Sequence, residues 1–124
     1  MIAVYVAPGP DAARLLAAAG APSGAALGFA VEVAENPGGP LAPEPAAYPL
    51  RLTLTPEWEL DDETAEDSLS ELLARKLAGA LGVKCVFVLP GPYQEVENAS
   101  VVSVAPDGVR TVEARAWKSG MRWP

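Results

Sequence analysis

The sequence predicts an α+β fold in which one mostly antiparallel sheet carries two helices packed on the same face. Three observations lead to this expectation. Several short runs alternate apolar and polar residues, two other stretches repeat apolar residues at helical spacing, and the chain has 124 residues, a common size for one domain. We therefore expect a single globular domain over residues 1–124, with the element order β-α-β-β-α-β-β-β.

The first strand and helix are marked by short-range signals. Apolar residues alternate over 2–6, and Pro8-Gly9-Pro10 ends the strand. Asp11 is expected to cap a short helix that runs to Gly20. A turn over 21–24 and a second strand over 27–34 follow. The order of elements in the first half of the chain resembles that of a ferredoxin-like unit.

A proline-rich loop is expected over residues 35–49. Three of its prolines are spaced by three, which would place them on one edge of a polyproline II helix. Such a segment can be a docking ligand for an aromatic-lined groove. A stiff surface loop between two strands is the interpretation we favour, because such loops are common and the motif is short.

The third strand shows the clearest alternation in the chain. Every second residue from Leu50 to Leu60 is apolar except at Pro56, which predicts one buried and one exposed face. Pro56 interrupts the run, so we expect an edge strand or a bulge rather than a central strand. Trp58 fits the alternation and is expected in the core, with an interfacial role as the alternative.

The second half begins with the longer of the two helices. Its apolar stripe ends at Gly82, and acidic residues precede it as the helix dipole prefers. An interior strand over 83–89 and a hairpin over 100–117 are expected to follow, with a frayed tail over 118–124. The stripe is predicted to consist of Leu69, Leu72, Leu73, Leu77, Ala80 and Leu81.

Charge is distributed unevenly along the chain. The net charge is −7, with 12 acidic and 2 basic residues in 1–74 but 4 acidic and 7 basic residues in 75–124. An acidic surface repels nucleic acid and anionic membranes and favours a basic partner. The uncharged stretch 15–31 is too short and too rich in alanine and glycine to span a membrane. We expect a cytoplasmic protein without a signal peptide.

The residue types available for chemistry are limited. The chain has no histidine, and its only cysteine, Cys85, lies in an apolar strand where burial would raise the thiol pKa. No nucleophile or phosphate-binding motif is present, so we expect no catalysis, no cofactor and no metal. A cleft lined by Tyr5, Tyr48 or Tyr93 with a buried carboxylate would indicate a small-molecule site instead.

Eight of the 16 carboxylates fall between Glu57 and Glu71. The calcium-loop pattern fails there, because Asp62 stands where glycine is required. Helix-dipole stabilisation and protection of a sheet edge explain part of the cluster, and the surplus points to a partner-binding face. The residues expected to bind that partner are Glu57, Glu59, Asp61, Asp62, Glu63, Glu66 and Asp67.

The stretch 69–113 combines an amphipathic helix ending in Leu-Gly, a valine-rich strand, a Pro/Gly/Tyr loop and a Pro-Asp-Gly hairpin. This organisation resembles that of small acidic bacterial single-domain proteins, including immunity proteins that neutralise toxins. The resemblance implies an inhibitor-type protein that presents its acidic face over 57–71 to a basic protein. The alternatives are an assembly component that forms homo-oligomers through a sheet edge or its C-terminal tail, and a small-molecule-binding domain.

Overall fold

The computed structural model describes residues 2–19, 29–38, 43–56, 63–89 and 100–114. Within them, the helices and strands follow one another in the predicted order, which confirms the α+β expectation. The elements are β1 (Ile2–Val6), α1 (Ala12–Ala19), β2 (Phe29–Glu35), β3 (Leu50–Pro56), α3 (Glu63–Leu81), β4 (Cys85–Leu89), β5 (Ser100–Val104) and β6 (Arg110–Ala114).

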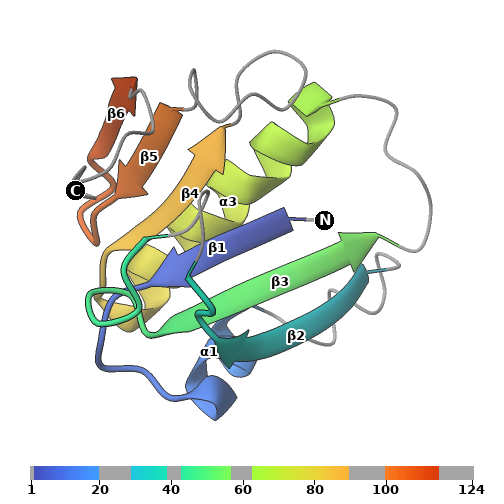
Figure 1. The fold of residues 1–124 in the computed structure, drawn as a ribbon, viewed down its shortest axis with the longest axis vertical. Helices are drawn as coiled ribbons and strands as arrows, with labels where there is room; N and C mark the ends of the chain where they lie inside the picture. Colours follow the sequence, from blue (N-terminus) through green and yellow to red (C-terminus); the bar gives the residue numbers. More distant parts are fainter. Residues whose placement is uncertain (1, 20–28, 39–42, 57–62, 90–99, 115–124) are drawn as a thin grey trace.

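The described strands form one antiparallel sheet in the order β2-β3-β1-β4-β5-β6. β3 lies between β1 and β2, and β1 lies between β3 and β4, so each β-α-β connection skips one strand. This split arrangement is the ferredoxin-like topology, here in the first six elements. The β5–β6 hairpin extends the sheet beyond β4 (Figure 1).

Both helices cover the same face of the sheet, as predicted, and Figure 1 looks onto the opposite face. The core lies between the helices and the sheet, where apolar residues of the strands meet one face of α3. Its buried members are Ile2, Val4, Val6, Leu15, Leu52, Leu73, Ala74, Leu77, Ala78, Cys85, Phe87, Val102 and Val104. Burial of this largely aliphatic set is the main source of stability for the domain.

The expectation that Pro56 places the third strand at a sheet edge is wrong. β3 pairs with β1 on one side and with β2 on the other, so it is a central strand. Pro56 is the last residue of β3, and its missing N–H therefore interrupts no hydrogen bonds further along the ladder. The predicted continuation through Trp58 to Leu60 lies outside the described residues.

The predicted apolar stripe of the second helix is also partly wrong. Leu72 is 64% exposed and Ala80 is exposed, whereas Ala74 and Ala78 are fully buried. Among the α3 residues whose side chains the structure describes, 69–81, the buried positions are 70, 73, 74, 77 and 78, so the helix is rotated relative to the predicted stripe. Two alanines on the buried face let α3 approach the sheet more closely than leucines would.

Three local signals act as the sequence predicts. Asp11 Oδ1 accepts a hydrogen bond of 2.8 Å from the Arg14 N–H, which caps α1. Gly82 ends α3 at a φ of 66°, a left-handed conformation that favours glycine. Gly108 has a φ of 89° in the turn that joins β5 to β6.

The described part of the 35–49 loop is held by a buried asparagine. The Asn36 side-chain amide donates hydrogen bonds of 2.9 Å to the carbonyls of Pro43 and Tyr48, and its oxygen accepts one from the Gly38 N–H. Pro43 is itself buried, so it is not free on the outer edge of a docking helix. These contacts favour the interpretation of a stiff loop between β2 and β3.

Candidate functional site

The acidic residues predicted to bind a partner fall into two groups. Glu57, Glu59, Asp61 and Asp62 lie outside the described residues. Glu63, Glu66 and Asp67 belong to the first turns of α3, where the structure describes the helix backbone but not these side chains. Their backbone placement puts three carboxylate residues at the N-terminal end of the longest described helix, where negative charge is favoured by the helix dipole.

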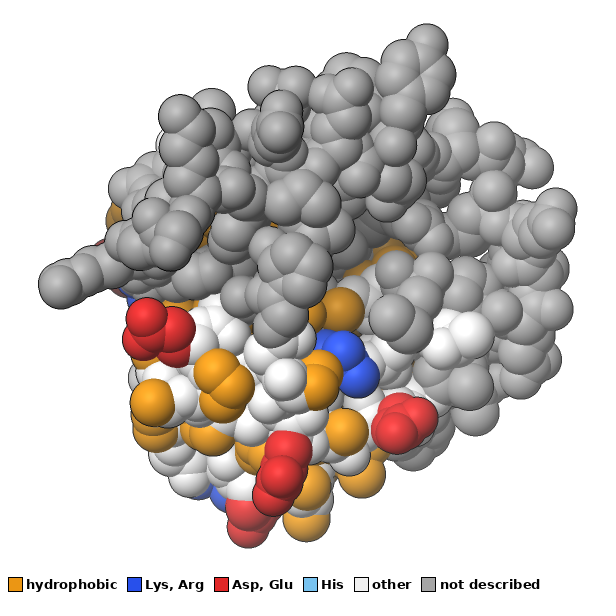
Figure 2. Space-filling model, viewed as in Figure 1, with side chains coloured by type: hydrophobic (Ala, Val, Ile, Leu, Met, Phe, Trp, Pro, Cys, Tyr) orange, Lys and Arg blue, Asp and Glu red, His pale blue; other side chains and the backbone are white. Residues whose placement is uncertain are grey.

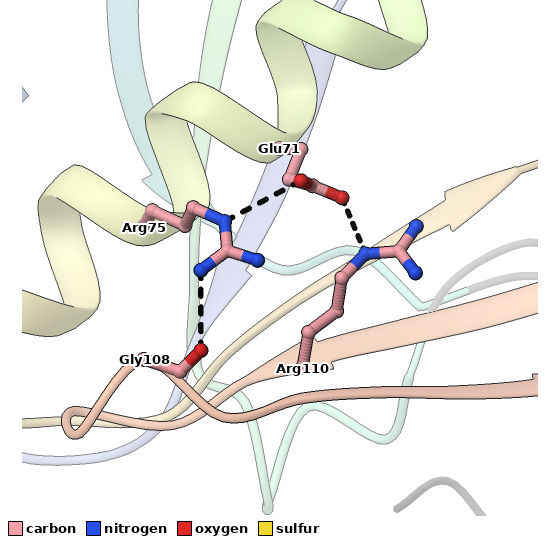
Figure 3. A network of polar contacts seen from close by, with 4 residues as sticks. All are labelled: Glu71, Arg75, Gly108 and Arg110. Carbon is pink, nitrogen blue, oxygen red and sulfur yellow. Dashed lines mark hydrogen bonds and ion pairs between the residues drawn. The ribbon is translucent and has the colours of Figure 1, made fainter.

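Glu71, the last carboxylate of the acidic segment, joins α3 to the hairpin. Its two oxygens accept hydrogen bonds from the guanidinium groups of Arg75, at 3.4 Å, and Arg110 (Figure 3). Arg75 also donates a 3.1 Å hydrogen bond to the Gly108 carbonyl, which ties the helix to the turn. Slight burial raises the pKa of Glu71, but the hydrogen bonds and charges of Arg110 and Arg75 outweigh it and lower that pKa overall.

Three large apolar side chains are exposed around this ion-pair network. Leu72 follows Glu71 and is 64% exposed, Val109 precedes Arg110 and is 57% exposed, and Val112 is 46% exposed. Val112 lies directly across from Val102, a core residue, so it is on the helix-covered side of the sheet. We call Glu71, Leu72, Arg75, Val109, Arg110 and Val112 the α3–hairpin surface.

The described basic residues of α3 are bonded to neighbouring elements. Arg75 is held by Glu71 and Gly108, and Lys76 donates a 3.4 Å hydrogen bond to the carbonyl of Ala19, the last residue of α1. Lys76 therefore lies at the C-terminus of α1, where a cation is favourable. The positive charge of Arg75 and Lys76 stabilises contacts within the domain itself. The acidic residues in the first turns of α3 have no cations among the next residues along the helix.

Sequence reasoning identified the acidic segment but not the α3–hairpin surface. The Glu71–Arg110 pair joins residues 39 positions apart, and no local pattern predicts it. Leu72 fits both a buried and an exposed position when only helical spacing is considered. The sequence feature that could have indicated the buried face of α3 was the pair Ala74 and Ala78, which are spaced by four residues and are not part of the predicted stripe.

Groups suited to catalysis are sparse among the described residues. Cys85 is buried, and burial raises its pKa to about 12, so the thiol is protonated and inert at neutral pH. Tyr5 and Tyr48 do come together, in a buried cluster with Val86 and Val101, whereas Tyr93 lies outside the described residues. The buried polar residues of the described ranges include no carboxylate.

No group of three or more metal-ligating side chains occurs among the residues that the structure describes. Within those ranges there is also no helix that combines the length and the apolar character needed to cross a membrane.

Comparison with known proteins gives no relative of this chain. No protein-family model matches it, and no curated protein or solved structure matches it significantly.

Proposed function

We propose that this protein is a non-catalytic protein-binding domain, of inhibitor or immunity type, that presents the acidic start of α3 and the adjoining α3–hairpin surface to a basic protein. The observation that carries the proposal is the exposure of Leu72, at 64%, on the helix that begins with the acidic residues. Exposed apolar side chains rimmed by charged groups are typical of protein–protein interfaces.

The α3–hairpin surface has the composition of such an interface. Leu72, Val109 and Val112 offer apolar area, and Arg75 and Arg110 stand beside them with their guanidinium groups fixed by Glu71. Fixed side chains lose little conformational entropy when a partner binds. Because Glu71 is already neutralised inside the domain, it contributes to the rigidity of the surface rather than to its net negative charge.

In addition to this apolar area, the acidic residues supply long-range electrostatic attraction. Carboxylates gathered in one region speed up the encounter with a basic partner, and the effect weakens as salt screens the charges. The expected partner therefore carries a basic active site or a basic binding groove that the acidic segment covers. The apolar residues then slow dissociation once the complex has formed.

Affinity capture from the host lysate tests this proposal, with the tagged protein at low and at physiological salt. A basic protein should be retained by the wild type and lost by Glu59→Lys/Asp62→Lys. The matched control is Glu35→Lys/Glu44→Lys, which changes the net charge equally at two exposed residues away from α3. Binding should survive in the control.

The apolar part of the surface is tested with the captured partner in purified form. Leu72→Ser should increase the dissociation rate with little change in the association rate, because it removes contact area rather than charge. Retention of the partner by both Glu59→Lys/Asp62→Lys and Leu72→Ser would refute the proposed surface. Capture of the protein's own copies alone would favour the assembly alternative.

A further inference from the structure

We propose that two copies of this chain form a symmetric dimer by pairing their β6 strands edge to edge, so that one sheet runs through both copies. β6 is at one end of the strand order, and among the described strands it pairs only with β5 (Figure 1). An open strand edge offers a row of N–H and C=O groups to which another strand can bond. This inference concerns the edge of the sheet and does not rest on the function proposed above.

The hairpin fixes which backbone groups of β6 point outwards. The Ala105 N–H donates a 3.0 Å hydrogen bond to the Val109 carbonyl, and the register of β5 and β6 continues from this pair along the strand. In an antiparallel ladder, residues that bond to the neighbouring strand alternate with residues that do not. The backbone groups of residues 111 and 113 therefore point to β5, and those that point away from the sheet belong to residues 110, 112 and 114.

The outward groups are self-complementary about Val112. When two antiparallel copies of β6 are aligned with Val112 opposite Val112, residue 110 of each copy lies opposite residue 114 of the other, so every outward-facing residue is paired. Sliding the copies by two residues leaves one of these residues without a partner strand, and in one direction it also places Glu113 opposite Glu113. The alignment about Val112 is therefore favoured, and it has the two-fold symmetry that is commonest among dimers.

Val112 gives this pairing an apolar centre. Its side chain is on the helix-covered side of the sheet but is 46% exposed. In the dimer the two Val112 side chains lie next to each other and remove apolar area from water. Arg110 already forms an ion pair with Glu71, and it lies opposite Ala114 of the other copy, so no like charges meet along the paired strands.

The other edge of the sheet is poorly suited to a second copy. β2 carries Glu32 and Glu35, both exposed, so two copies joined there would bring like charges together. The whole chain has a net charge of −7, and Figure 2 shows acidic side chains over the described surface with few basic ones among them. Copies of this protein therefore repel one another, and β6, with one arginine and one glutamate, is the edge where strand charge does not oppose contact.

Oppositely charged variants test the contact between the two Val112 side chains, with sedimentation equilibrium of the purified chain as the measurement. The fraction of wild-type dimer should rise between ~10 μM and ~1 mM protein. Val112→Lys and Val112→Glu should each weaken association by about tenfold, because like charges then meet at the two-fold axis. An equimolar mixture of the two should form a heterodimer, which also shows that both variants fold. Leu72→Lys and Leu72→Glu, the same changes at an exposed residue of α3, should leave dimerisation unchanged.

Salt distinguishes this dimer from the binding of a basic partner. Higher ionic strength screens the repulsion between two chains of net charge −7, so dimerisation should strengthen. Binding of a basic partner to the acidic segment should weaken under the same conditions. Failure of the dimer and failure of the proposed function are therefore separate results.

Amide hydrogen exchange, followed by nuclear magnetic resonance, reports on the outward groups directly. The Val112 N–H should exchange more slowly as the protein concentration rises, because it is bonded to a strand only in the dimer. The Thr111 N–H points to β5, so its exchange should depend far less on concentration. This pair of neighbouring amides thus compares the open edge of β6 with its paired edge.

Four results would overturn the proposal. A chain that stays monomeric at ~1 mM has no such interface. A Val112 N–H that is equally protected at every concentration shows that the edge is covered within one chain. A dimer that survives both Val112→Lys and Val112→Glu, or a mixture of these variants that fails to associate, places the contact elsewhere. Oligomers larger than a dimer require a second edge, because pairing of β6 with β6 closes the assembly.

Discussion

The two faces of the sheet are built from the same strands but have different compositions. On the helix-covered face, Val4, Leu52, Phe87 and Val102 are fully buried and aliphatic or aromatic without polar atoms. The opposite face also buries residues, but among them are tyrosines, Thr53 and Ser103. Alternation along each strand therefore separates a predominantly apolar core from a face that retains more hydrogen-bonding groups.

This difference indicates a division of roles. An apolar face packed against two helices supplies burial energy and specifies how the helices sit. A face with hydroxyls and an unpaired Arg51 Nε gives up some of that energy. Residues that lower stability are expected mainly where they serve binding. If so, substitutions on the two faces should differ in their effect on unfolding free energy as much as the faces differ in composition.

The largest effect is expected at the helix-covered face. Leu77→Ala should lower the free energy of unfolding by about 3 kcal/mol, because Leu77 is fully buried between α3 and the sheet. Leu72→Ala, the same change five residues earlier on the same helix, should alter it by less than about 0.5 kcal/mol. Urea unfolding followed by circular dichroism measures both. Equal losses would show that Leu72 is packed and that the α3–hairpin surface is not free.

The loop that borders the other face should give the next largest effect. Asn36→Ala should lower the free energy of unfolding by about 2 kcal/mol, since it leaves the buried carbonyls of Pro43 and Tyr48 without that donor. Asp107→Ala removes an exposed side-chain bond to the Val109 N–H and should cost about 0.5 kcal/mol. The same unfolding assay compares the two variants, and a smaller loss for Asn36→Ala than for Asp107→Ala would contradict a rigid loop.

Alkaline pH should destabilise the protein through Cys85 on the helix-covered face. Burial raises the pKa of this thiol from 9.0 to about 12, so the folded thiol stays protonated while the unfolded one ionises. The contribution is therefore complete below pH 9 and is lost as the pH rises towards 12. Near pH 10 the loss from this one group should be about 1 kcal/mol.

Cys85→Val should make the unfolding free energy less dependent on pH above 9. Tyr48, in the cluster on the opposite face, also has a raised pKa, owing first to burial and then to the charge of Cys85. Tyr48→Phe in the Cys85→Val background should therefore remove a further part of the alkaline dependence. If Cys85→Val leaves the pH profile unchanged, the thiol is accessible to water in the folded protein.

The smallest effect is expected at the rim, where Glu71 joins α3 to the hairpin. Glu71→Gln should lower the free energy of unfolding by less than about 1 kcal/mol at neutral pH, because both arginine partners are more than a third exposed. The pKa of folded Glu71 is lowered, so this stabilisation is present above its ordinary pKa of 4.5 and is lost as the pH falls through the lowered value. Denaturant curves at pH 7 and pH 2, each at low and high salt, should show the difference only at pH 7 and low salt.

Much of the fold was determined by short-range patterns in the sequence. Alternation identified β1 and β3, a turn signal marked the β5–β6 hairpin, Asp11 and Gly82 marked helix ends, and the order of elements was confirmed throughout the described ranges. These features depend on the preferences of a few consecutive residues, so one sequence is sufficient to predict them. The acidic segment from Glu57 to Glu71 was likewise evident from composition, and its role stays a proposal.

The tertiary structure alone decided which elements are neighbours. It placed β3 in the centre of the sheet, rotated α3 so that Ala74 and Ala78 replace Leu72 at the core, and brought Arg110 to Glu71. It also set Arg51 between Ala34 and Tyr5. Periodicity shows which residues share a face of a helix or strand. Which element packs against that face depends on interactions between segments far apart in the sequence, and a local pattern does not determine their free energy.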